Sequence, residues 1–350
     1  MSWKLSRFRA GDLVEVRSPE EILAGLDAKG CQGGIPFMPE MLQFCGQQHR
    51  VRAVAHKTCD TAKRTWTGRR LDATVHLEGM FCDGSAHGGC QAECTLFWKD
   101  AWLKRVDERA DRTDRATSGA GCSEADLHVH TRRGGDPGQE TRYTCQATEL
   151  FDFTRPLPVY DLRQYWYDVT TGNHSAAHVL RVVFLACLRW ILPRLPAGYR
   201  VFKAFQDRAH LALSGRPTPE LTAHLPEGER TPTGRLDLAA GETVRVKAQP
   251  EIEPTLDPAG KNRGLTFDPQ EMAPYCGRVV KVRKAVTRII DEFSGKMIEM
   301  KQPCIMLEGV VCRSEYANRR LNCPRAIPSY WRELWLERVE PGAREGDAGA

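Results

Sequence analysis

The chain has 350 residues, of which 41% are hydrophobic and 27% are charged, and its formal net charge is +5. These values are typical of a folded globular protein, so they exclude wholesale disorder, and the length allows more than one domain. Because the small positive charge is not gathered into one block, it argues only weakly for a polyanionic partner, and nucleic-acid binding stays a minor hypothesis.

Neither the first residues nor the most apolar run has the pattern of a targeting or membrane-spanning segment. Residues 1–16 lack the apolar stretch of about 7 to 15 residues that a signal peptide needs. The most apolar run, residues 176–192, contains two arginines and is followed by Pro193, so it predicts a core helix rather than a membrane span. We therefore expect a cytoplasmic protein without a membrane span.

The first part of the chain recurs near its end. Residues 8–46 match residues 238–277, residues 77–82 (LEGMFC) match residues 307–312 (LEGVVC), and residues 97–106 match residues 330–339. The matched positions include Gly11 with Gly241, Val14 with Val244, Glu40 with Glu271, and Cys45 with Cys276. So many matches in one register indicate an internal duplication.

Both copies predict the same elements in the same order. Alternating apolar residues predict a first strand over 11–18 and 241–248, and a short helix follows over 19–27 and 250–257. Further strands are expected over 50–57, 73–82, 279–286 and 304–312, with a hairpin turn at Ser294 and Gly295. The tryptophan pairs Trp98 with Trp102 and Trp331 with Trp335 are spaced i, i+4 and predict a terminal helix packed on the sheet.

A strand, an excursion and several short strands are the pattern of a small barrel. The opening FRAGDLVEVR also resembles the first strand of SH3-like barrels, such as those of nitrile hydratase beta subunits and translation proteins. The predicted fold is α+β, with two duplicated small SH3-like β-barrels that flank a mostly helical insert. The predicted domains are residues 1–106 (first barrel with a Cys-rich loop), 107–235 (insert), 236–340 (second barrel) and 341–350 (disordered tail).

The insert has no counterpart in either copy. Residues 162–195 predict helix interrupted near Gly172, whereas residues 105–121 and 130–142 are charged or Gly-rich and predict loops. Residues 214–235 predict a Pro-rich linker into the second copy. In the segment LHVH, His128 and His130 alternate, which would place both on one face of a strand.

Thirteen cysteines are an unusual number for a protein that we expect in a reducing compartment, where clustered thiols bind metal or do redox chemistry. The segment CDGSAHGGCQAEC (82–94) has the glycines of a turn that can surround an ion. Its spacing fits neither the paired knuckles of zinc ribbons nor the ferredoxin run, so we expect ligands from several segments. The predicted metal ligands are Cys59, Cys82, Cys90, Cys94, Cys122, Cys145, Cys304, Cys312 and Cys323.

Soft thiolate ligands favour an iron–sulfur cluster, our first choice, or zinc. The alternative is that these thiols are buried structural residues, as we expect for Cys187 on its apolar helix. His87, Arg163 and Arg325 are candidates for contacts with a substrate, because arginine and histidine bind anionic groups.

Several segments together resemble a cysteine-rich bacterial family found with biosynthetic gene clusters: AHKTCDT, CDGSAHGGCQAEC, YTCQATEL, YDLRQYWYDV and CPRAIPSYWRELWLERV. The resemblance covers nearly the full length and implies a shared architecture and a role in specialised metabolism. We therefore expect a metalloprotein that acts as a redox or metal-dependent tailoring enzyme, with a small-molecule substrate or a biosynthetic protein as partner. The alternative is a non-catalytic scaffold in which zinc staples the loops and the barrels bind a protein or nucleic acid.

Overall fold

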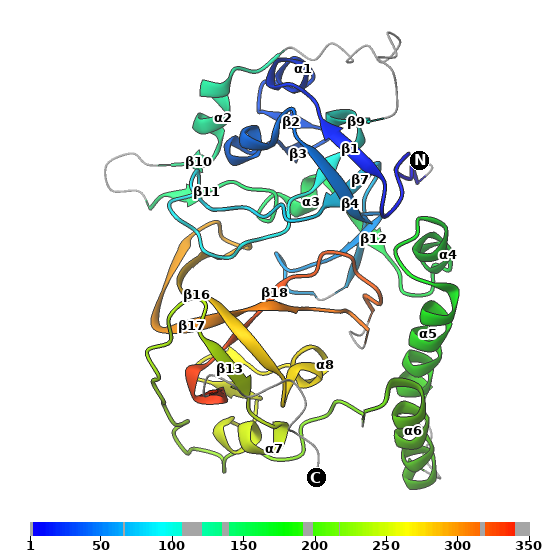
Figure 1. Ribbon diagram of the computed structural model, residues 1–350, viewed down its shortest axis with the longest axis vertical. Coiled ribbons are helices and arrows are strands. Elements are labelled where there is room, and N and C mark those ends of the chain that lie inside the picture. Colours follow the sequence, from blue (N-terminus) through cyan, green and yellow to red (C-terminus); the bar gives the residue numbers. More distant parts are fainter. Residues whose placement is uncertain are drawn as a thin grey trace. The chain divides into compact units, whose positions relative to one another are not determined.

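The computed structural model describes residues 3–65, 67–106, 121–134, 140–191, 199–216, 218–315 and 319–339 (Figure 1). They form helices and antiparallel sheets, so the predicted α+β class is confirmed. The chain divides into two compact units. The first consists of residues 1–179, 288–299 and 318–326, and the second of residues 180–287, 300–317 and 327–350.

These units have other boundaries than the predicted domains. Much of the predicted insert, up to residue 179, belongs to the first unit. Two short segments from the predicted second barrel, 288–299 and 318–326, also belong to the first unit. The boundaries differ because the units are defined by contacts in space, whereas the predicted domains were defined by the sequence repeat. The predicted tail, residues 341–350, lies outside the described residues.

The first unit is built on a five-stranded antiparallel sheet with the strand order β8-β7-β4-β1-β9. Its strands are β1 (Leu13–Val16), β4 (Gln48–Val54), β7 (Thr74–Leu77), β8 (Trp98–Lys99) and β9 (Leu103–Arg105). Alternate residues face the core, as the fully buried Val14 and Val16 of β1 show. The strands predicted from the alternating pattern are therefore present.

Most of a five-stranded sheet with the corresponding order β18-β17-β16-β13-β19 lies in the second unit, and residues 288–290 and 297–299 of its hairpin belong to the first unit. Its strands are β13 (Thr243–Val246), β16 (Val279–Ile290), β17 (Met297–Val311), β18 (Pro328–Trp331) and β19 (Leu336–Arg338). Val14 lies opposite Arg105 in the first sheet, and Val244 lies opposite Arg338 in the second. The hairpin predicted at Ser294 and Gly295 connects β16 and β17.

Three aromatic residues at matching positions of the sequence repeat pack in the core of each unit. In the first unit, the rings of Phe37, Trp98 and Trp102 meet edge to face, with centroids 5.1 to 6.4 Å apart. The corresponding rings of the second unit are those of Phe267, Trp331 and Trp335, at 5.7 to 6.4 Å. Edge-to-face packing adds to the stability gained from burying such large side chains.

The prediction of a terminal helix at the tryptophan pairs is wrong. Each pair is divided between a strand and a 3-10 helix, η2 (Asp100–Trp102) or η6 (Glu333–Trp335). No closed barrel is found in the described residues, because β8 and β9 do not pair although η2 connects them directly. The 3-10 turn carries the chain from one edge of the sheet to the other without a hydrogen-bonded ladder.

Shorter elements complete the two units. Those of the first unit are α1 (Pro19–Ala24), β2 (Cys31–Gln32), β3 (Ile35–Pro36), η1 (Pro39–Phe44), β5 (Lys57–Cys59), β6 (Gly68–Arg70), α2 (Glu124–His130), β10 (Arg132–Arg133), β11 (Arg142–Tyr143), α3 (Leu150–Phe153), β12 (Arg155–Leu157) and α4 (Arg163–Thr170). Those of the second are α6 (Tyr199–Ser214), α7 (Gln249–Ile252), η4 (Glu253–Thr255), β14 (Lys261–Asn262), β15 (Leu265–Thr266), α8 (Pro269–Met272) and η5 (Ala273–Tyr275).

The helical part of the predicted insert is interrupted where expected. α4 ends before Gly172, which has a φ of +79°, and α5 (Ala176–Ile191) begins four residues later. One face of α5 is buried, but Leu180 and Phe184 are exposed, so the core-helix prediction holds for that face alone. In the described part of the chain, no helix is long and apolar enough to span a bilayer.

The segment with His128 and His130 is a helix, so the prediction of a strand there is wrong. Ser123 caps α2 by accepting a hydrogen bond from the N–H of Asp126, whose carboxylate accepts one from the N–H of Ser123. This reciprocal cap fixes the helix start and outweighs the short alternating pattern.

A buried ion pair connects β5 to α4. Lys57 Nζ lies 2.7 Å from Asp168 Oδ2, and His56 Nε2 lies 3.2 Å from Asp168 Oδ1. Burial opposes the charge of Asp168, but Lys57 and His56 outweigh it and hold the pKa of this carboxyl below its usual value. The carboxylate of Asp168 therefore stays ionised, and its contact with Lys57 ties the two elements together.

Candidate metal centre

The glycine-rich segment after β7 folds into a closed loop. Phe81 and Thr95 form an isolated β-bridge at its neck. Beside this bridge, the N–H of Cys82 donates to the carbonyl oxygen of Cys94 at 2.9 Å. Residues 82–94, which the sequence singled out for their thiols, are therefore held together at their two ends.

Glycine is required inside this loop. Gly84 has a φ of +73°, and a side chain there would overlap the backbone of Cys90. The carbonyl oxygen of Gly84 accepts a hydrogen bond from the N–H of His87 at 3.0 Å. This tight turn brings His87, which is fully buried, to the inner side of the loop.

The third member of the site is an acidic residue in an apolar stretch. Glu40 lies in η1, between Pro39, which starts this 3-10 helix, and the fully buried Met41. Only 5% of Glu40 is exposed. A carboxylate in such surroundings is costly unless a hydrogen bond or a cation compensates it.

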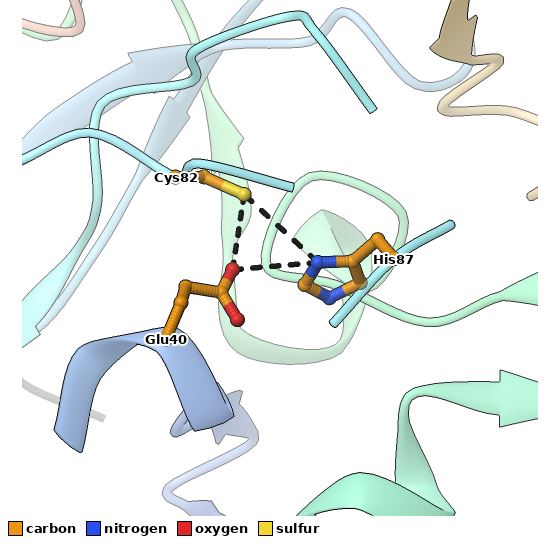
Figure 2. Close-up of side chains that lie close together, drawn as sticks. All are labelled: Glu40, Cys82 and His87. Carbon is orange, nitrogen blue, oxygen red and sulfur yellow. Dashed lines mark hydrogen bonds and ion pairs between the residues drawn. The ribbon is translucent and has the colours of Figure 1, made fainter. Parts of the chain in front are cut away.

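Glu40, Cys82 and His87 converge on one point (Figure 2). Cys82 Sγ lies 3.0 Å from Glu40 Oε1 and 3.9 Å from His87 Nδ1, and His87 Nδ1 lies 3.3 Å from Glu40 Oε1. Among the described residues, these are the three side chains whose oxygen, sulfur and nitrogen ligand atoms all lie within 4.8 Å of one another. They form a group that could hold a metal ion.

The protonation of this group is set by its burial. Burial, followed by the charge of Glu40, raises the pKa of the Cys82 thiol well above its usual value. Burial lowers the pKa of His87, although Glu40 and the backbone of Thr144 oppose this. Without a metal, Cys82 is therefore a protonated donor to Glu40, and His87 is neutral at pH near 7 with a lone pair available.

Glu40 has too few partners for a buried carboxylate. Its Oε1 accepts the hydrogen bond of the Cys82 thiol, whereas its Oε2 is buried and has no hydrogen-bond partner among the described residues. The nearest basic group is His87, whose lowered pKa leaves it uncharged. A divalent cation bound between the three side chains would supply the missing positive charge.

A small cavity adjoins this group. Its lining includes Cys82, His87, Cys90, Cys94, Cys145, Glu292 and Arg325, all in the first unit. The cavity volume of about 40 Å³ leaves room for a metal ion and a few water molecules. Four of the cysteines predicted as metal ligands thus share one cavity with two of the predicted substrate contacts.

Gln146 positions Cys145 at this cavity. Its side chain accepts a hydrogen bond from the N–H of Phe97 at 2.8 Å and donates to the carbonyl oxygens of Phe97 at 3.0 Å and Pro36 at 2.9 Å. The side-chain amide of Gln146 therefore makes the hydrogen bonds that the backbone of a neighbouring strand would make. Burial raises the pKa of the Cys145 thiol to about 12.

Arg325 lies at the other end of the cavity and is 1% exposed. Its guanidinium donates to Thr61 Oγ1 at 2.6 Å and to Glu292 Oε1 at 3.1 Å. Burial opposes its charge, but Glu292 and three neighbouring cysteines together outweigh burial and raise the pKa of Arg325 above its ordinary value. Its charge also acts on Cys94, where it opposes the rise in pKa that burial and Glu292 cause.

The other predicted ligands lie elsewhere. Cys59 and Cys323 form a pair of their own in the first unit, with their thiols hydrogen-bonded to each other. Cys122 packs against the hydrophobic core of the first unit. Cys304 and Cys312 belong to the second unit, where Cys312 Sγ lies 3.1 Å from Ser314 Oγ.

Arg163, predicted as a substrate contact, does not line the cavity. It forms an exposed ion pair with Asp161 at 2.7 Å and lies over the ring of Trp3. Of the predicted substrate contacts, His87 lies among the possible metal ligands and Arg325 lines the cavity.

Glu40 and Glu292 are site residues that were not predicted from the sequence. Glu40 carried one signal, because it is the single charged residue in the apolar stretch PFMPEMLQF. Glu292 carried none, since an acidic residue in the hairpin segment IIDEFSG looks like an ordinary solvent-exposed turn.

Comparison with known proteins finds no similar family or curated protein. The chain matches no protein-family model, and a search of curated proteins finds none that is significantly similar to it. The group and its cavity are therefore the features that indicate a function.

Proposed function

We propose that the protein is a zinc-dependent enzyme whose Glu40, Cys82 and His87 hold the metal. The observation that carries this proposal is the buried carboxylate of Glu40, which lies 3.0 Å from a thiol and 3.3 Å from a neutral imidazole and has no cationic partner among the described residues. One oxygen, one sulfur and one nitrogen are ligands that zinc accepts together.

The number of ligands favours a catalytic zinc site over a structural one. Structural zinc sites are closed by four protein ligands, whereas catalytic sites have three and an open position. Here three ligand atoms lie together, and the adjoining cavity has space for a water molecule or a small polar group. A zinc ion in such a site lowers the pKa of bound water and polarises carbonyl groups.

The residues of the chain have separate roles in this proposal. Glu40 and Cys82 supply the negative charge that balances the ion, and Cys82 gives up its proton when the metal binds. Arg325, held by Thr61 and Glu292, presents a fixed positive charge to an anionic group of a small substrate. A substrate with a carboxylate suits this arrangement and agrees with the expected role in specialised metabolism.

A second candidate cofactor is an iron–sulfur cluster, and one observation favours it. Cys82, Cys90, Cys94 and Cys145 all line the same cavity, and four thiolates are the usual ligands of such a cluster. In the described residues, however, no three of these sulfur atoms lie within 4.8 Å of one another. The mixed group with Glu40 and His87 is therefore preferred.

The two sheets support a further part of the proposal, that the chain arose by internal duplication. Their equal strand order and their equal aromatic triplets agree with the recurring sequence. Cys312 takes the place of Cys82 and Glu271 that of Glu40, but nothing in the sequence of the second copy takes the place of His87. We propose that only the first copy keeps the metal centre.

The duplication supplies matched controls for a metal-binding test. The protein is purified without oxygen, stripped with a chelator and titrated with zinc, and iron and acid-labile sulfide are measured before stripping. One zinc per chain should bind to the wild type and be lost in Cys82→Ser and His87→Gln, while Cys312→Ser should bind zinc like the wild type. Brown protein that contains iron and acid-labile sulfide would indicate an iron–sulfur cluster in place of zinc. Stoichiometric zinc in both Cys82→Ser and His87→Gln would refute the proposed site.

Cobalt provides a check on the ligands themselves. Co²⁺ bound in place of zinc absorbs in the near ultraviolet when a thiolate coordinates it. This band should be present in the wild type and in Cys312→Ser, and absent in Cys82→Ser even at saturating cobalt. An unchanged band in Cys82→Ser would assign the thiolate ligand to another cysteine of the cavity.

A further inference from the structure

Outside the metal group and its cavity, the first unit contains a second pair of adjacent thiols. Cys59 ends β5 and is 3% exposed, and Cys323 lies in the turn 319–326 and is 6% exposed. Their thiols are hydrogen-bonded to each other, although 264 residues separate them in the chain. Neither thiol lines the cavity beside Glu40.

The turn that carries Cys323 is firmly anchored to the first unit. The carbonyl oxygen of Arg319 accepts from the N–H of Gly68 at 3.1 Å, and that of Pro324 accepts from Arg52 Nη2 at 2.7 Å. The buried Asn322 approaches the carboxylate of Asp168 with its Nδ2 at 3.4 Å from Oδ2.

The backbone of this turn is strained, so its position depends on these contacts. Arg319, Asn322 and Ala326 have φ values of +64°, +56° and +51°, in the left-handed region that non-glycine residues seldom adopt. Neighbouring strands thus hold the turn in a conformation that places the sulfur of Cys323 next to that of Cys59. No large movement is needed to bring the two sulfur atoms together.

Charged neighbours act on the thiol of Cys59. The hydrogen bond to Cys323 and burial raise the pKa of Cys59 well above its usual value, and the charges of Arg325 and Arg320 oppose this rise. A thiolate is the nucleophile in thiol–disulfide exchange, and cationic neighbours increase its population.

From these contacts we propose that Cys59 and Cys323 form a redox couple that exchanges between dithiol and disulfide with small disulfides. Cys323, the more exposed of the two, attacks one sulfur of the small disulfide and forms a mixed disulfide. The leaving thiolate takes up the proton of the attacking thiol. Cys59 then attacks the sulfur of Cys323, the protein disulfide forms, and a second small thiol leaves with the proton of Cys59. The protein loses two protons and two electrons, which reduce the small disulfide to two thiols.

The position of Arg325 connects this couple to the metal centre. Arg325 is two residues from Cys323 and lines the cavity with Glu292. A disulfide at Cys323 would pull on the turn that holds this guanidinium. The couple itself does not depend on the proposed zinc chemistry, so each can be tested alone.

The test uses the native full-length protein and cystamine as the small disulfide. After incubation, free thiols are blocked with an alkylating reagent and the protein is cleaved with trypsin. Cleavage gives peptides 58–63 and 321–325, each with one cysteine. The expected product is these two peptides joined, lighter than their sum by two hydrogen atoms and separated again by dithiothreitol.

Variants distinguish a Cys59–Cys323 disulfide from oxidation of other thiols and from metal binding by this pair. The joined peptide should be absent in Cys59→Ser and in Cys323→Ser and present in Cys187→Ala. The proposal is overturned if both peptides stay alkylated while other thiols are oxidised. It is also overturned if Cys59→Ser or Cys323→Ser folds normally and loses one equivalent of zinc, because the pair would then be metal ligands. Because the product is sought in the wild type, a variant that fails to fold leaves the test intact.

Discussion

Replacing the carboxylate of Glu40 by an amide should affect the metal-free and metal-bound protein in opposite directions. In the metal-free protein, the buried carboxylate of Glu40 has one thiol donor and a neutral imidazole as neighbours. Removing a buried and poorly compensated charge should stabilise this form by about 1 to 3 kcal/mol. In the zinc-bound protein, Glu40→Gln removes an anionic ligand, so zinc affinity should fall by about 100-fold or more, ~2.8 kcal/mol at 1.4 kcal/mol per tenfold.

Urea unfolding followed by tryptophan fluorescence, with chelator and with excess zinc, measures both effects. Trp98 and Trp102 lie in the core of the first unit and should report its unfolding. Glu271→Gln, at the position that the sequence repeat matches to Glu40, is the control and should change neither the stability with chelator nor the zinc affinity. If Glu40→Gln destabilised the metal-free protein and bound zinc like the wild type, Glu40 would only be the acceptor for Cys82.

Three further outcomes follow from the buried ionisable groups. Zinc affinity should rise about tenfold per pH unit between about pH 6 and 8, because one proton leaves Cys82 on binding while His87 is already neutral. A steeper rise would mean that His87 also loses a proton. The metal-free protein should lose stability as the pH rises above 9.0, the ordinary value for a thiol, because burial raises the pKa of Cys145 to about 12 and the unfolded chain loses its proton first. Cys145→Ala should reduce this alkaline loss, and an unchanged pH profile would contradict the reasoning. Asp168→Asn should lower the unfolding free energy by about 3 to 5 kcal/mol, because it leaves the buried Lys57 unpaired, and a change within about 0.5 kcal/mol would show that the pair is not needed.

The strands were predictable because alternation of apolar residues specifies a half-buried strand directly. β1 and β13 follow this rule, with Val14 and Val16 buried in one and Val244 and Val246 in the other. The tryptophan pairs were misread because a spacing of four residues also fits a strand followed by a 3-10 turn. Here the choice is made by Phe37, which packs against both Trp98 and Trp102.

The candidate site was predictable only within one segment. Cys82, His87 and Cys90 lie in one glycine-rich loop, and the spacing of thiols and glycines indicated a site there. The other parts come from places that no local pattern connects. Glu40 precedes the loop by 42 residues, and Arg325 follows Cys82 by 243 residues. Only the tertiary fold brings them together.

The composition of the first unit also dictates when its cavity can exist during synthesis. Cys145 leaves the ribosome early, but Glu292 and Arg325 are made much later, and 325 − 145 is 180 residues. At about 5 to 20 residues per second, this interval lasts roughly 9 to 36 s. Until Arg325 is made, the thiols of the loop are present without the arginine that completes their surroundings, and for most of this interval the carboxylate of Glu292 is also missing. The nascent chain therefore exposes unprotected cysteines for many seconds, and metal supply or a chaperone has this interval in which to act.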